Sequence, residues 1–144
     1  MNSIELEELL SSVETFKGVW ASDRLRFFEF APGSRASIIV NIQPRWMSGL
    51  HWVVFAWDGE NLQYFDSSGI PPVWHPCFNG FILKHGGYKR CRINTRLIQS
   101  PDSDLCGQYC ALFVCVFDSG WNIDTFIQCF TASPKVNGKI IAAV

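Results

Sequence analysis

The hydrophobic pattern predicts a buried β-hairpin in the middle of the chain. Residues 51–57 (HWVVFAW) are apolar at odd and even positions alike, which is typical of a strand covered on both faces of a sheet. The turn-forming residues 58–61 (DGEN) follow, and residues 62–66 (LQYFD) are expected to return as the second strand. The pattern therefore places residues 51–66 in one hairpin.

Residues 106–117 are apolar around nearly the whole circumference of a helix, which predicts a helix buried in the core. The polar loop 99–104 leads into this helix, and residues 118–120 (DSG) are expected to end it. Ser103 or Asp104 is placed to cap its first turn.

The remaining elements are shorter. Asn2 and Glu5 have the spacing of a capping box, which predicts an amphipathic helix that extends to Val13. Further strands are expected at 37–43 and within 90–98, a short helix at 123–130, and irregular segments at 16–32, 44–49 and 67–76. Because neither repeats nor a linker interrupt the pattern, it predicts one α+β domain over residues 1–144.

The composition excludes several classes of protein. Hydrophobic residues make up 48% and charged residues 17%, which allows a real core and excludes a disordered chain. Glu5, Glu7 and Glu8 interrupt any signal-peptide core, and no stretch approaches the roughly 20 apolar residues of a membrane span. We therefore expect a protein that is neither secreted nor membrane-bound, with six free cysteines and no zinc site.

The net charge of −1 gives no general attraction to nucleic acid. Residues 67–101, however, contain no Asp or Glu. The basic residues among them are Lys84, Lys89, Arg90, Arg92 and Arg96. This run predicts a local basic patch that could bind nucleic acid or an acidic partner, and an ordinary solvated loop surface is the commoner explanation of such a run.

Cys106 is a candidate nucleophile because it stands in the first turn of the buried helix. The positive end of the helix dipole and the unpaired N–H groups there favour a thiolate. Gly107 follows directly, so no side chain is expected to crowd a substrate that approaches the sulfur. Position alone does not decide the matter, because Cys110 and Cys115 are ordinary buried-helix cysteines by the same pattern.

The hairpin brings a histidine and a carboxylate together. If Trp57 pairs with Leu62, or alternatively with Glu60, His51 and Asp66 lie on the same face at the open end of the ribbon, with Cβ atoms about 4.5–8 Å apart. A carboxylate in that place can fix the imidazole tautomer that a general base needs. Taken singly, the histidine could be a core residue and the aspartate a turn residue.

The other two histidines, His75 and His85, lie in Pro-rich and Gly-rich surroundings and are expected at the surface. All three histidines precede Cys106, which excludes the papain-like order of nucleophile and base if Cys106 is the nucleophile.

Three segments resemble the adenovirus endopeptidase family, which is related in fold to the SUMO-deconjugating proteases. They are 51–57 (HWVVFAW), 64–69 (YFDSSG) and 99–110 (QSPDSDLCGQYC), and the opening segment with 16–18 (FKG) and 23–24 (DR) is similar as well. The most specific feature is Gln99, seven residues before the Cys-Gly-x-x-Cys start of a helix.

The resemblance implies a Cys-His-Asp triad with a glutamine in the oxyanion hole. Cys106 matches the nucleophile, His51 the base, and Asp66 the acidic third member. Gln99 matches the oxyanion-hole glutamine, with the Cys106 backbone N–H as the second donor.

Trp52 matches the tryptophan beside the family's histidine, and we expect Trp52 and Gly107 to line the substrate groove. The family also implies a mixed β-sheet flanked by helices, with the nucleophile at the N-terminus of a buried central helix. We expect a viral cysteine endopeptidase that cleaves capsid and core precursors at Gly-containing sites, in the virion and the host-cell interior.

The chemistry itself requires no cofactor and no metal. The family enzymes are basic and are activated by DNA and a short viral peptide. An activating peptide or DNA is left open for this protein, although the net charge of −1 weighs against DNA. Two other functions remain open: a ubiquitin-like-protein deconjugating hydrolase, which would use the same four residues, and a non-catalytic binding module on the same scaffold.

Overall fold

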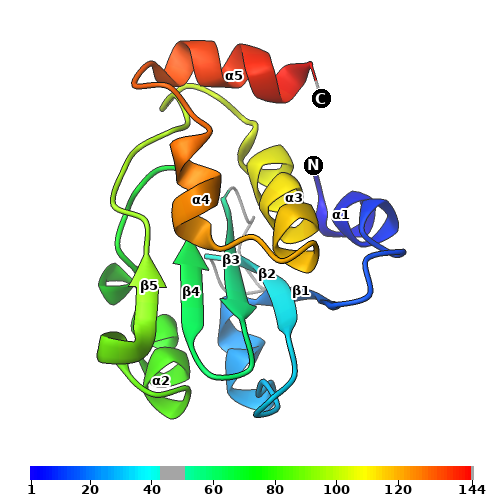
Figure 1. Ribbon diagram of the computed structural model, residues 1–144, viewed down its shortest axis with the longest axis vertical. Helices are drawn as coiled ribbons and strands as arrows, with labels where there is room; N and C mark the ends of the chain where they lie inside the picture. The colour runs from blue at the N-terminus through cyan, green and yellow to red at the C-terminus, as the bar shows by residue number, and fades with distance from the viewer. Residues whose placement is uncertain (43–50, 144) are drawn as a thin grey trace.

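A five-stranded mixed β-sheet forms the centre of the protein in a computed structural model that describes residues 1–42 and 51–143 (Figure 1). The strands are β1 (Phe16–Ala21), β2 (Ala36–Asn41), β3 (Trp52–Trp57), β4 (Leu62–Phe65) and β5 (Cys91–Ile93). They lie side by side in chain order. The two outer pairs, β1 with β2 and β4 with β5, are parallel, and β2, β3 and β4 are antiparallel.

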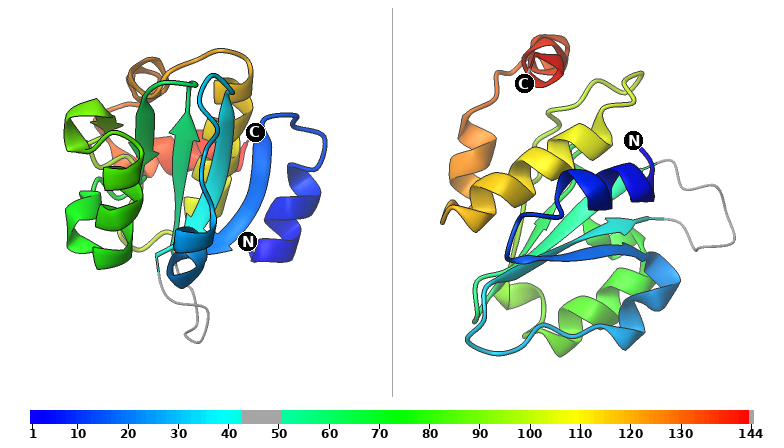
Figure 2. Two further views of the ribbon diagram at one scale, coloured as in Figure 1. Left: turned by 90° about the horizontal axis from the view of Figure 1, so that it is seen from below. Right: turned by 90° about the vertical axis from the view of Figure 1, so that its right-hand side faces the viewer.

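Helices cover both faces of the sheet. The helices are α1 (Ser3–Leu9), α2 (Pro76–Lys84), α3 (Cys106–Asp118), α4 (Ile123–Gln128) and α5 (Pro134–Ala142), with 3₁₀ turns at Ser22–Phe27, Pro72–Trp74 and Tyr88–Arg90. Helices α1, α3 and α4 pack on one face, and α2 with the first 3₁₀ turn packs on the other (Figure 2). The described residues thus form the mixed α+β domain expected from the sequence.

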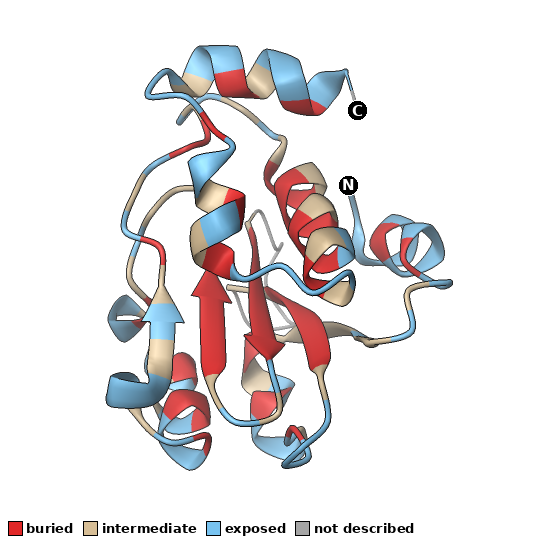
Figure 3. Ribbon diagram, viewed as in Figure 1, coloured by how far each residue is buried: buried red, intermediate tan, exposed pale blue. Residues whose placement is uncertain are grey.

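Strand β3 is buried along its whole length, as its apolar pattern predicts (Figure 3). Its even-numbered residues contribute to the core against α3, and its odd-numbered residues contribute to the core against α2. Helix α3 is likewise buried on most of its circumference, which confirms the prediction of a central helix over 106–117.

The hairpin of β3 and β4 adopts the first of the two expected registers, in which Trp57 pairs with Leu62. The Asp58 carboxylate closes the four-residue turn by accepting two backbone N–H groups, at N–Oδ1 distances of 2.9 and 2.6 Å. As a result, His51 and Asp66 stand at the same end of the hairpin and on the same face.

Several segments differ from the sequence-based expectation. Residues 16–32 are not irregular throughout, because β1 forms an edge strand there. Its residues are mostly half-buried, and Gly18 has a φ of 102° beside a shift in register, so no alternation announces a strand. Helices α2 and α5 were not predicted, and both begin with proline in the first turn.

The other expectations are confirmed with small changes in bounds. The capping box exists, since the Glu5 backbone N–H donates to Asn2 Oδ1 at 2.8 Å, but α1 ends at Leu9 rather than Val13. The expected strand over 90–98 is the short β5, and the helix over 123–130 is α4. Residue 43 of the strand predicted at 37–43, and the loop predicted at 44–49, lie outside the described residues.

A buried asparagine joins α5 to the loop before α3. The Asn137 side chain is fully buried and donates from Nδ2 to the carbonyl of Ile98 at 3.1 Å. Its Oδ1 accepts the backbone N–H of Thr131 at 2.7 Å.

None of the described helices is long and apolar enough to cross a membrane.

We expect Phe113→Ala to destabilise the protein by about 3–5 kcal/mol, because it removes a fully buried ring from the core. That ring packs against Phe65 on β4 and Phe126 on α4, with centroid distances of 5.3 and 5.1 Å. Urea unfolding followed by tryptophan fluorescence measures the change. Phe27→Ala is the control, because that ring is 58% exposed and its loss should cost less than about 1 kcal/mol.

Candidate active site

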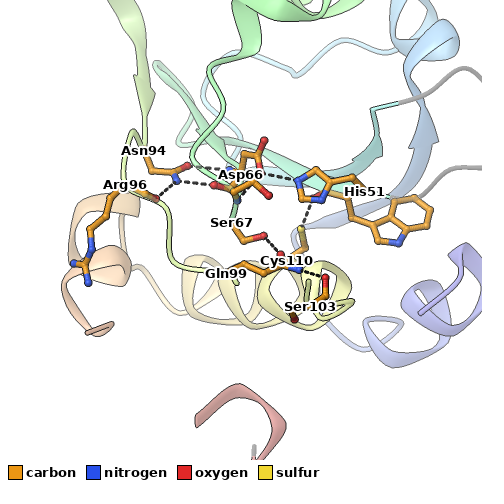
Figure 4. A network of polar contacts seen from close by, with 10 residues as sticks. His51, Asp66, Ser67, Asn94, Arg96, Gln99, Ser103 and Cys110 are labelled. Carbon is orange, nitrogen blue, oxygen red and sulfur yellow. Dashed lines mark hydrogen bonds and ion pairs between the residues drawn. The ribbon is translucent and has the colours of Figure 1, made fainter. Parts of the chain in front are cut away.

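His51 and Asp66 meet at the end of the hairpin, as the register requires (Figure 4). His51 Nε2 lies 2.6 Å from Asp66 Oδ1. Asp66 is 1% exposed, and the same oxygen accepts the backbone N–H of Ser68 at 2.8 Å. The aspartate is therefore both the turn residue and the histidine's partner, and the two readings of the sequence are compatible.

The backbone of Asp66 is held by an asparagine that the sequence did not single out. Asn94, just after β5, accepts the Asp66 N–H at 2.8 Å and donates from Nδ2 to the Asp66 carbonyl at 2.7 Å. These two bonds continue the pairing between β4 and β5 beyond the last ladder residues, so the carboxylate is presented from a fixed backbone.

Cys106 is the first residue of α3, and its thiol is buried and hydrogen-bonded to His51. Because Asp66 occupies Nε2, Nδ1 is the ring nitrogen that remains for the sulfur. The expected side-chain cap is absent. Leu105 takes the N-cap position without a side-chain hydrogen bond, and the Ser103 hydroxyl instead accepts the Leu105 N–H at 3.2 Å.

The pair is tuned toward a thiolate and an imidazolium. Burial disfavours the charged ring, but the hydrogen bonds to Asp66 and Cys106 and the nearby negative charge outweigh it and raise the pKa of His51 to about 9. Burial alone would raise the pKa of the Cys106 thiol. The hydrogen bond with His51, backbone contacts with Trp52 and Gly107, and the charge of His51 together lower that pKa below its ordinary value.

Gln99 is buried on the segment that leads to α3, between Ser67 and Ser103 (Figure 4). Its Nε2 donates to the carbonyl of Ser103 at 2.9 Å, and its Oε1 accepts the hydroxyl proton of Ser67. Ser67 is fully buried, and like Asn94 it was not identified from the sequence, where it reads only as part of a turn.

Trp52 and Gly107, expected in a substrate groove, are covered by the first residue of the chain. The Trp52 indole donates from Nε1 to the carbonyl of Met1 at 3.0 Å. A Cβ added at Gly107 would lie 3.1 Å from Met1 Cβ and 3.5 Å from the Trp52 ring. The space beside Gly107 is thus filled by Met1, and the open approach expected there is not present in this structure.

The remaining histidines differ from each other. His75 is half-buried, whereas His85 is buried and not at the surface as expected. The ring of His85 accepts the Phe30 N–H at Nε2, with a distance of 3.0 Å, and its Nδ1 contacts the Phe81 carbonyl at 2.8 Å. This histidine is a satisfied core residue. Among the described residues, no group of three potential metal ligands comes together.

The predicted basic patch is largely engaged in local contacts. Arg90 pairs with Glu60 at 3.3 Å and Arg92 with Asp124 at 2.5 Å, both on the surface. The guanidinium of Arg96 donates to main-chain carbonyls in the last turn of α4 and just after it, and the Lys84 ammonium donates to carbonyls in and near the first 3₁₀ turn. The acidic partners come from segments outside 67–101, which is why the local sequence did not reveal them.

The sequence is similar to those of several known proteases. No family model matches the sequence. A protease of bovine adenovirus 4 is 28% identical over 149 aligned residues, which cover 92% of this chain and 74% of that protein. The protease of fowl adenovirus A serotype 1 is 32% identical over 79% of this chain, and that of human adenovirus D serotype 17 is 26% identical over 78%. The chain is related to the adenovirus proteases.

The relationship to adenovirus proteases supports a viral peptidase at the level of the family. The aligned part of this chain corresponds to 62% of the fowl virus protease and 61% of the human virus protease. The relationship therefore extends over most of this chain and over a smaller share of several relatives.

The raised pKa of His51 gives a testable pH dependence. Turnover through this pair needs a thiolate and a protonated imidazole, so it should rise through the lowered pKa of Cys106 and fall again as pH passes about 9. Alkylation of Cys106 by iodoacetamide needs only the thiolate, so it should persist above that pH. A turnover rate that stays level well beyond pH 9 would contradict the assignment of the proton to His51.

Asp66→Asn should lower turnover by about ten- to ten-thousand-fold without unfolding the protein, because an amide can present the wrong group to His51 Nε2. The measurement is kcat on a peptide substrate, with circular dichroism as the check on folding. Asp124→Asn, at an exposed ion pair on α4, is the matched control and should leave kcat unchanged. Wild-type kcat in Asp66→Asn would mean that the 2.6 Å contact has no role in turnover.

Proposed function

We propose that this protein is a thiol protease in which Cys106 attacks the carbonyl of a peptide bond. The observation that carries the proposal is the continuous contact from Asp66 through His51 to a cysteine at the first position of a buried helix. Each member has the partner that the chemistry needs, and the relationship to adenovirus proteases supports the same class of reaction.

In the proposed reaction, the Cys106 thiolate adds to the scissile carbonyl carbon. The negative charge that develops on oxygen is bound by the Cys106 N–H and by the second Nε2 proton of Gln99, since the first is donated to Ser103. The imidazolium of His51 then gives its proton to the leaving amine, and an acyl-enzyme forms. Water next attacks the thioester, with His51 accepting the proton and the thiolate departing.

Asp66 acts on the base and not on the substrate. Its carboxylate accepts the Nε2 proton of His51, keeps Nδ1 directed at the sulfur, and stabilises the imidazolium between the two proton transfers. Its Oδ2 is buried and has no hydrogen-bond partner among the described residues, so the bonds to His51 and to the Ser68 N–H are both made by Oδ1.

We propose viral structural precursors as the substrates, cleaved at Gly-containing sites inside the virion or the host cell. Small residues near the scissile bond suit the confined surroundings of Cys106, where Trp52 and Met1 leave little room beside Gly107. A substrate would either pass on the other side of the sulfur or displace Met1.

The deciding experiment is reaction of the purified protein with a peptide electrophile that ends in Gly-Gly or Gly-Ala, followed by intact mass and site mapping. A single adduct on Cys106 is expected, because it combines a lowered thiol pKa with a histidine partner. The adduct should disappear in His51→Ala and persist in Cys115→Ala, which removes an exposed cysteine of the same helix.

An adduct spread over the exposed cysteines, or one on Cys106 that survives in His51→Ala, would contradict the proposal. An adduct that forms only when DNA or a basic peptide is added would identify an activator. Cleavage of a ubiquitin-like conjugate in preference to a Gly-containing capsid peptide would move the substrate assignment to the deconjugating class.

A further inference from the structure

Ser67 lies where the turn that carries Asp66 contacts the segment that carries Gln99. It follows Asp66 directly and is fully buried. Its carbonyl accepts the backbone N–H groups of both Ile98 and Gln99, each at 3.0 Å. The turn that carries Asp66 is therefore joined through Ser67 to the segment that carries Gln99.

The orientation of the Gln99 amide follows from its two partners. The carbonyl of Ser103 can only accept, so the amide group 2.9 Å from it must be Nε2. The amide oxygen then faces Ser67, and the Ser67 hydroxyl must donate its proton to Oε1. The Ser103 carbonyl thus identifies the Nε2 end of the amide, and the Ser67 hydroxyl holds the oxygen at the other end.

We propose that Ser67 is a positioning residue that aims the free Nε2 proton of Gln99 at the oxyanion. This inference rests on the proposed thiol-protease function and deepens it. With Ser67 in place, the amide is held at both ends, and the remaining Nε2–H has one direction. Without the hydroxyl, the buried Oε1 loses its donor, and the amide can rotate away from the oxyanion.

The alanine variant isolates this hydroxyl. The two backbone bonds accepted by the Ser67 carbonyl do not depend on the side chain, so Ser67→Ala should keep the turn intact. The matched control is Ser37→Ala on β2. Ser37 is also fully buried, and its hydroxyl has no hydrogen-bond partner among the described residues.

The experiment measures kcat and KM on a fluorogenic peptide amide, and in parallel the rate at which iodoacetamide alkylates Cys106. Ser67→Ala should lower kcat by about 5- to 50-fold, less than the hundredfold or more typical of losing an oxyanion donor outright. KM and the alkylation rate should change less than about twofold, because substrate binding and the thiolate do not involve the amide of Gln99. Ser37→Ala should leave all three unchanged.

A double-mutant cycle tests whether the effect passes through Gln99. In a Gln99→Ala background, Ser67→Ala should reduce kcat by less than about twofold further. An equal loss in both backgrounds, a loss in alkylation rate, or a wild-type kcat in Ser67→Ala would each overturn the inference.

A magnetic resonance readout separates this inference from the function on which it rests. The side-chain NH₂ signals of Gln99 should shift in Ser67→Ala and stay in place in Ser37→Ala, whether or not any substrate is cleaved. If the wild-type protein hydrolyses no peptide amide, the proposed function fails, and unchanged Gln99 signals in Ser67→Ala would overturn the positioning role separately.

Discussion

The site depends on the register between β3 and β4. Side chains alternate between the two faces of a strand, so a slip of one residue would carry Asp66 to the opposite face from His51. The pairing of Trp57 with Leu62 prevents this, and the Asp58 carboxylate holds the turn that sets it. Burial of β3 on both faces adds a second constraint, because a slip of one residue would place its side chains in the wrong core.

With that register set, the site is assembled from two layers of the protein. His51 is in phase with the residues of β3 that face α2, whereas Cys106 belongs to α3 on the other face. His51 and Cys106 can meet only at the ends of the strands, where a side chain can reach past the sheet from one face to the other. The Cys110 thiol, 3.2 Å from the carbonyl of Trp52, is one contact that sets the height of α3 above β3.

The sequence predicts those parts that rest on strong local patterns. The doubly apolar strand, the hairpin turn and the apolar helix after Gln99 were sufficient to bring His51 and Asp66 together and to place Cys106 at a helix start. The resemblance to a known family added the expectation that Gln99 is an oxyanion donor, which its neighbours in the sequence alone do not suggest.

The rest depended on contacts between distant segments. Asn94 holds Asp66 across 28 positions and Ser67 holds Gln99 across 32, and neither spacing has a periodic signature. Met1 reaches Trp52 across 51 positions, which no local pattern encodes. The edge strand β1 shows no alternation of buried and exposed residues, because most of its residues are half-buried.

The Asn137 contact gives the last helix an influence that its exposed position conceals (Figure 3). The Asn137 side chain donates to the carbonyl of Ile98, the residue before Gln99. The Tyr109 hydroxyl on α3 donates to the same carbonyl at 3.3 Å. Proteolytic removal of α5 would break the hydrogen bond from Asn137 to Ile98 without cutting the sheet or α3. A nicked protein of this kind would still fold and still carry the Cys106 thiol, yet it would hold Gln99, the proposed oxyanion donor, more loosely, so folding assays alone would miss the damage.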